Sequence, residues 1–156
     1  MKMRPASFMI LFWAACAAMA SAAVSCNVSS PGVAFGTYSS IAGSDRDTSA
    51  TITVTCTGTV GDSVSYSLRL SSGGGSYTNR SLAGTIDTLR YNLFTDIGRS
   101  QVWGDGSAGT MVVNDSYSLA TSPTIRDYTV YGRIPGGQTQ VHQDGYNDSI
   151  TVELDY

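Results

Sequence analysis

The side chains of this sequence that could act in catalysis or metal binding are few and scattered. His142 is the only histidine, and it lies in GQTQVHQDG, a turn-like stretch with no serine or cysteine nucleophile signature beside it. Asp45 and Asp47 in GSDRDTS have a spacing found in calcium loops, but the glycine and distal acidic ligand of an EF-hand are missing. Asp105 in WGDG is typical of an aspartate that bonds its own turn. We therefore predict no catalytic residue, no metal site and no cofactor.

Longer catalytic motifs are missing from the sequence as well. It has no G-x-S-x-G, no glycine-rich loop that opens a helix and no zinc-ligand spacing. Distant aspartates could still converge into a glycosidase pair, but no pattern points to one. We predict that the protein is not an enzyme. The structural elements that carry these residues are therefore the next guide to its function.

Those elements alternate between apolar and polar residues with a period of two, which is typical of half-buried strands. The expected strands are ATITVTCTG (50–58), SVSYSLRLS (63–71), TLRYNLFT (88–95), DYTVYGRI (127–134) and the last segment, SITVELDY (149–156). Turn-forming residues separate them at 58–63, 71–81, 96–101, 104–109 and 134–147. No stretch keeps a helical period, so the pattern predicts an antiparallel β-sandwich of one domain, residues 23–156.

The last segment keeps its alternation to the final residue. Ile150, Val152, Leu154 and Tyr156 share one face. An amphipathic strand with nothing left to pair beside it predicts an open sheet edge, which natural proteins normally protect.

The first residues read as a secretory signal peptide, residues 1–22. Lys2 and Arg4 precede an apolar run over residues 8–18, and residues 20–22 form a small-residue cleavage pattern. Without those two cations, seven basic residues remain against twelve acidic ones, a net charge of 7 − 12 = −5. This acidic balance argues against nucleic acid or an anionic membrane as partner. We expect no membrane span after processing.

The cysteines fit an exported protein. Cys16 would leave with the signal peptide, and Cys26 and Cys56 then form an even pair, for which a disulfide is expected. Two free buried thiols are the alternative. Ala14-Ala15-Cys16 also suggests a lipoprotein signal, but Trp13 stands where a lipobox has leucine.

Several segments resemble one known family. CNVSSPGVAFGTYSS, TVTC, LRYNLFTD, VWGDG, TVYGRIP and GYNDSITVELDY follow one another in the order seen in the spore coat protein U family, from Cys26 to Tyr156. This family includes the pilins of archaic, Csu-type chaperone–usher pili. The resemblance implies an incomplete immunoglobulin-like antiparallel β-sandwich that lacks its final strand.

The resemblance also implies the partners and the location. A periplasmic chaperone, and later a neighbouring pilin subunit, would supply the missing strand along Ile150, Val152, Leu154 and Tyr156. An outer-membrane usher would export the growing fibre, which places the protein in a cell-surface fimbria, or secreted. The alternative is a non-polymerising secreted or coat β-sandwich that acts as a binding module.

One departure from the family pattern bears on the position in the fibre. Polymerising pilins carry a donor segment ahead of the first cysteine, but only Ala23, Val24 and Ser25 precede Cys26 after the expected cleavage. At ~3.3 Å per residue they would reach about 10 Å, too short for a donated strand. We therefore expect an acceptor-only subunit at the tip or cap of a fibre.

A tip subunit suggests adhesion through its loops. The candidate surface-contact residues are Tyr77, Trp103 and Tyr146, with the 141–146 region around the last of them. Trp103 and Tyr146 read more naturally as core or turn anchors. WGDG also occurs in family members that are not tip subunits, which favours a structural role for Trp103.

Overall fold

The computed structural model describes residues 23–156, so the predicted signal peptide lies outside the described residues. Within this range the strands are β1 (Ser25–Ser29), β2 (Arg46–Thr57), β3 (Ser63–Leu70), β4 (Gly75–Ser76), β5 (Asn79–Ala83), β6 (Thr88–Phe94), β7 (Val113–Ser118), β8 (Thr124–Ile134) and β9 (Val152–Asp155). The same residues include no helix that is long and apolar enough to cross a membrane.

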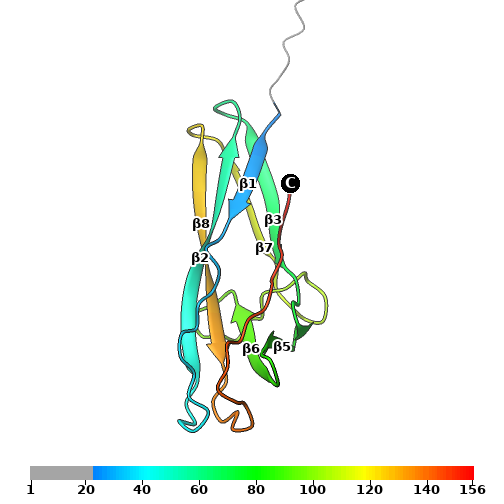
Figure 1. Cartoon of the computed structure of the whole chain (residues 1–156). Coiled ribbons are helices and arrows are strands. Elements are labelled where there is room, and N and C mark those ends of the chain that lie inside the picture. The colour runs from blue at the N-terminus through cyan, green and yellow to red at the C-terminus, as the bar shows by residue number, and fades with distance from the viewer. Residues whose placement is uncertain (1–22) are drawn as a thin grey trace, which may run out of the picture.

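The strands form two antiparallel sheets. One has the order β1-β2-β8-β6-β5-β4 and the other the order β7-β3-β9. The long strands β2 and β8 run along the elongated molecule (Figure 1). The two edge strands β1 and β9 lie near each other, but they belong to different sheets and are not paired.

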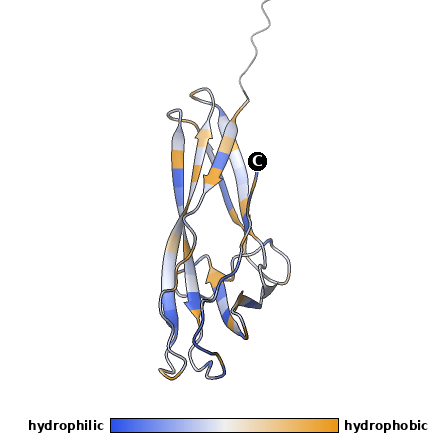
Figure 2. Cartoon of the chain, viewed as in Figure 1, coloured by the Kyte–Doolittle hydropathy of each residue, from blue (hydrophilic) through white to orange (hydrophobic). Residues whose placement is uncertain are grey.

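The core consists of the inward residues of the alternating strands, and Figure 2 shows apolar and polar residues following one another along them. Side chains that alternate across a strand place every second residue between the sheets. The buried residues on the paired strands are Ile52, Val54, Cys56, Val64, Tyr66, Leu68, Leu70, Leu89, Tyr91, Leu93, Val130 and Ile134. The four inner strands predicted from periodicity, β2, β3, β6 and β8, supply all of them.

One side of the sandwich is closed by a polar cluster between β3, β7 and β8. The hydroxyl groups of Tyr66 and Tyr128 lie 2.6 Å apart, and Tyr128 donates a hydrogen bond to Asp115 (2.5 Å). The Tyr66 ring meets the rings of Tyr117 and Tyr128 edge to face. Burial raises the pKa of Tyr66 to about 12, so the hydroxyl stays protonated and able to donate.

The stretch 71–81, which the sequence predicts as a turn, contains the short hairpin of β4 and β5, so this expectation was wrong. A buried cation holds the hairpin in place. Arg80 is fully buried and donates to the carbonyl oxygens of Ser71 (2.8 Å) and Trp103 (2.7 Å) and to Asn92 Oδ1 (2.7 Å). Periodicity alone does not reveal β4 and β5, because tertiary contacts rather than a long alternating pattern stabilise them.

The disulfide expected from the sequence is present. Cys26 on β1 and Cys56 on β2 face each other in the strand pairing, with their Cα atoms 4.1 Å apart. The bond closes a loop with a sequence separation of 30 residues. It therefore ties the edge strand β1 to the long central strand β2.

We predict that the double variant Cys26→Ser/Cys56→Ser unfolds about 3–4 kcal/mol more easily, because the open loop regains conformational entropy in the unfolded chain. Urea unfolding followed by tryptophan fluorescence measures the change. Reducing agent should shift the wild-type midpoint in the same direction and leave the double variant unmoved. An unchanged midpoint after reduction would show that the bond does not stabilise the fold.

Candidate functional site

A groove opens between two irregular segments of the chain that flank the core. The first wall is residues 30–41, which follow β1, and the second wall is residues 141–150, which lead into β9 (Figure 1). Two adjoining cavities lie along it, an upper one of about 320 Å³ and a lower one of about 980 Å³. Among the hydrogen bonds of residues 23–156, none joins the first wall to the second.

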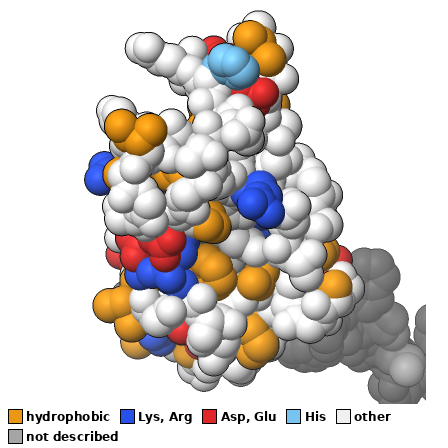
Figure 3. Space-filling model, turned by 90° about the horizontal axis from the view of Figure 1, so that it is seen from below, with side chains coloured by type: hydrophobic (Ala, Val, Ile, Leu, Met, Phe, Trp, Pro, Cys, Tyr) orange, Lys and Arg blue, Asp and Glu red, His pale blue; other side chains and the backbone are white. Residues whose placement is uncertain are grey.

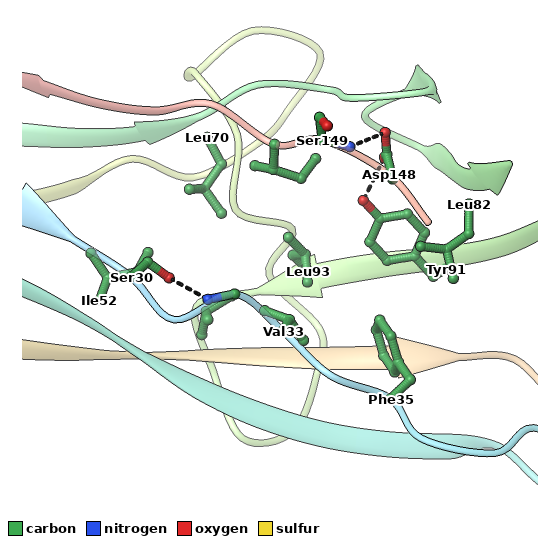
Figure 4. Close-up of a pocket in the computed structure, with 13 residues that line it drawn as sticks. Ser30, Val33, Phe35, Ile52, Leu70, Leu82, Tyr91, Leu93, Asp148 and Ser149 are labelled. Atoms are coloured by element: carbon green, nitrogen blue, oxygen red, sulfur yellow. Dashed lines mark hydrogen bonds between the residues drawn. The ribbon is translucent and has the colours of Figure 1, made fainter. Parts of the chain in front are cut away.

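The floor of the groove is the core itself. Core residues from both sheets line the upper cavity, and Figure 4 shows their side chains between the two walls. They are Ile52, Leu70, Tyr91, Leu93 and Val130. Leu89 and Ile134 continue the apolar floor in the lower cavity. The floor of both cavities is thus apolar and part of the core, a surface that apolar side chains of a bound segment can contact.

Side chains hold the first wall to the long strands. The ring of Phe35 packs on Gly132 of β8, where an added Cβ would lie 2.8 Å from the ring, so only glycine fits. Arg46 donates to the carbonyl oxygen of Phe35 (2.8 Å), and Thr48 donates to that of Ala34 (2.9 Å). The wall is therefore fixed without joining a strand ladder.

The second wall is held by Asp148 and by short backbone contacts. Asp148 accepts hydrogen bonds from the Tyr91 hydroxyl (2.6 Å) and the Gly74 amide (2.9 Å). Burial, followed by the hydrogen bond to Asp148, raises the pKa of Tyr91. Asn147 exchanges two backbone hydrogen bonds with Ala83, at 2.7 and 3.0 Å. These bonds fasten the wall to β5 and β6, and the bond between Tyr91 and Asp148 joins two residues that line the upper cavity.

Further contacts hold the second wall at the end of the molecule seen in Figure 3, where the single histidine lies beside an acidic side chain. His142 contacts Asp87 through its ring Nδ1, and its amide donates to the same carboxylate (3.0 Å). Asp144 accepts from the Thr85 amide. The His142 side chain lowers the pKa of Asp87, and the Thr85 amide lowers that of Asp144. Two ionised carboxylates thus join this wall to the β5–β6 turn.

The apolar side chains of the edge strands above the groove are also only partly covered by the rest of the protein. The inward residues of β1 and β9, unlike most of those on β2, β3, β6 and β8, are only half-buried: Cys26, Val28, Val152 and Leu154. Ile150 lines the upper cavity. Tyr156 lies beyond β9 and is 60 % exposed, so of the four predicted edge residues it alone does not pack on the core.

The polar residues considered first have structural roles in the described chain. Asp47 pairs with Arg133 (2.7 Å) and Arg99 (3.3 Å), and Asp45 pairs with Arg133 (3.2 Å). Asp105 accepts from the amide and hydroxyl of Ser107, as a turn aspartate does. Residues 23–156 contain no group of three or more His, Cys, Asp or Glu side chains placed to hold a metal ion.

For Trp103, the prediction of a surface contact was wrong. Trp103 is 1 % exposed and donates from its indole nitrogen to the Leu68 carbonyl oxygen (3.1 Å), so it anchors the core and cannot touch a surface. Tyr77 and Tyr146 are half-buried. Tyr146 packs partly on the core and donates to the His142 carbonyl oxygen (2.9 Å), yet it also lines the lower cavity.

Sequence reasoning missed the first wall and Asp148. A signal for the wall does exist, because Val33 and Phe35 alternate in PGVAFG. However, the flanking Gly32 and Gly36 have φ values of 85° and 69°, which only glycine adopts easily, and they cut the alternation to three residues. Asp148 resembles any loop aspartate until the fold brings Tyr91 and Gly74 to it.

Comparison with known proteins agrees with this architecture. The family model for the Spore Coat Protein U domain matches residues 12–153. The chain belongs to the Spore Coat Protein U domain family. No curated protein matches it. Residues 12–22 of the match overlap the predicted signal peptide, which stays a prediction.

A solved structure has a similar fold. It is the crystal structure of the CsuC-CsuE chaperone-tip adhesion subunit pre-assembly complex from archaic chaperone-usher Csu pili of Acinetobacter baumannii. One of its chains aligns with a TM-score of 0.58 and 17 % identity over 86 % of the present chain and 40 % of its own length. The present chain thus spans less than half of that protein. The predicted fold class, an incomplete immunoglobulin-like β-sandwich, is confirmed.

We predict that acid loosens the second wall before it unfolds the sandwich. The folded-state pKa values of Asp87 and Asp144 are depressed, so their stabilisation is present above the ordinary aspartate pKa, about 3.9, and lost as pH falls through the lower folded values. NMR amide shifts of Thr85 and His142 between pH 6 and pH 2 measure this. Asp87→Asn should remove the change in the His142 amide shift that comes from this carboxylate and keep the change in the Thr85 amide shift. Shifts that move only with global unfolding would contradict the prediction.

Proposed function

We propose that this protein is a structural and adhesive subunit of a surface fimbria assembled by the chaperone–usher pathway through donor-strand complementation. The observation that carries the proposal is the groove between residues 30–41 and 141–150, whose floor is the hydrophobic core. The family match and the similar fold of a chain from a chaperone–subunit complex support it.

An extended segment of another protein is the occupant that suits this groove. Such a segment can place alternate apolar side chains on the floor and use its main chain along an unpaired strand edge, as β9 offers on the side away from β3. Four or five side chains at ~1.5–3 kcal/mol each contribute a gross gain of roughly 6–15 kcal/mol before ordering costs. This gain is comparable to the whole stability of a small domain.

The partners follow from this mode of binding. A periplasmic chaperone would fill the groove first, a neighbouring pilin subunit would replace it with its own strand, and an outer-membrane usher would export the fibre. The subunit would therefore pass through the periplasm to the cell surface. Ile150, Val152, Leu154 and Tyr156 form the proposed edge for chaperone and donor strand, and Tyr77 and Tyr146 remain proposed surface contacts.

We predict that a synthetic peptide covering the strand donated by a partner pilin raises the melting temperature of the subunit. Ile150→Glu places a charge in the groove and should abolish the rise, whereas Thr151→Glu adds the same charge on the exposed face and should preserve it. Differential scanning fluorimetry measures both. A stable, monodisperse monomer whose melting temperature no such peptide raises would instead favour a non-polymerising secreted or coat binding module.

The finer proposal is that the subunit accepts a strand without donating one. After cleavage behind Ala22, three residues precede Cys26, which span about 10 Å at ~3.3 Å per residue, and this is too short for a donated strand. Such a subunit can occupy only the distal end of a fibre, where loop residues meet a surface.

We predict that immunogold labelling of an epitope-tagged copy decorates fibre ends. Continuous labelling along the shafts would contradict the acceptor-only role and leave strand complementation intact. N-terminal sequencing of the exported protein provides the control, because cleavage well before Ala22 would lengthen the segment ahead of Cys26.

A further inference from the structure

One charged side chain interrupts the apolar lining at the junction of the two cavities. Val33, Phe35, Leu82 and Asp148 line both cavities and mark the junction between them. Among the described residues that line the upper cavity, Asp148 is the only one with a carboxylate or a cationic group. Any strand that runs through both cavities must pass this carboxylate.

The carboxylate has unused acceptor capacity. Its Oδ1 atom accepts from the amides of Gly74 (2.9 Å) and Ser149 (2.7 Å), and its Oδ2 atom accepts from the Tyr91 hydroxyl (2.6 Å; Figure 4). A carboxylate offers about four acceptor positions, so one position on Oδ2 is left among these contacts. A strand that covers this oxygen with a methyl group removes it from water and supplies no replacement.

The charge at the junction favours a neutral donor over a cation. Arg80 lies buried near Asp148, and its own hydrogen bonds go to two carbonyl oxygens and an amide oxygen rather than to a carboxylate. A positive charge thus already lies near Asp148. The junction needs a hydrogen-bond donor, and a second cation would add repulsion from Arg80.

We propose that the groove selects a donor strand with a hydroxyl side chain, threonine or serine, at the residue facing Asp148, between apolar residues on either side. This inference rests on the proposed strand complementation and specifies its partner. Threonine and valine have nearly the same shape but differ in the hydroxyl group, so exchanging them isolates the hydrogen bond. Against the apolar floor, at Ile52, Leu93 or Val130, a threonine hydroxyl would be buried without a side-chain acceptor.

The test is a threonine scan of a host peptide in which every inward residue is valine and every outward residue is serine. Each inward valine is replaced in turn by threonine, and the dissociation constant of each peptide for the mature subunit is measured by fluorescence anisotropy. We expect threonine to weaken binding about tenfold at apolar positions and to strengthen it about tenfold at one internal position. A lysine scan of the same peptide should show no preferred internal position.

Asp148→Ala should abolish the preference for threonine at that position. The readout is the ratio of threonine to valine affinities within each variant, so a general loss of stability cancels. Asp144→Ala is the matched control, because Asp144 is an acidic residue of the same wall whose carboxylate is bound to Thr85, and it should keep the preference.

The outcomes separate the two proposals. If the all-valine peptide and every variant of it fail to bind, strand complementation itself is overturned. If the valine peptide binds but no position favours threonine, or lysine is favoured instead, or the preference survives Asp148→Ala, the hydroxyl selection is overturned and complementation stands.

Discussion

Two packed β-sheets must cover each other's apolar faces, and along one side of this sandwich the cover is missing. Most inward residues of β2, β3, β6 and β8 are buried, whereas β1 and β9 at the adjoining edges leave theirs half-buried. The hydrophobic effect scales with the apolar area removed from water, so a partner that covered the half-buried residues of β1 and β9 would gain binding free energy. The groove and its two walls adjoin these half-buried edge strands.

The two lateral sides of the sandwich differ in how the core between the sheets is closed off from solvent. On the side of β7, Tyr66, Tyr128 and Asp115 close the space with hydrogen bonds that leave their polar atoms satisfied. On the side of the groove, no hydrogen bond among the described residues joins the two walls.

The walls are fixed by contacts to the strands beside them and not by contacts to each other. Arg46 and Thr48 hold the first wall from behind, and Asp148 and Asn147 hold the second to β5 and β6. A wall that is already ordered loses little conformational entropy when a partner binds, which favours affinity. Asp148 fastens the second wall with two hydrogen bonds, from Gly74 and Tyr91, and it also lines both cavities.

The sequence by itself determined the class of fold, the inner strands and the disulfide, because a two-residue period and a pair of cysteines are local patterns that need no partner to be recognised. It also pointed to Ile150, Val152 and Leu154 as an edge. Only the tertiary structure decided that residues 30–41 form the opposite wall, that Trp103 is buried, and that Asp148 meets Tyr91 inside the groove. These features depend on contacts between residues far apart in the chain, and no local spacing records which distant side chains the folded sheets bring together.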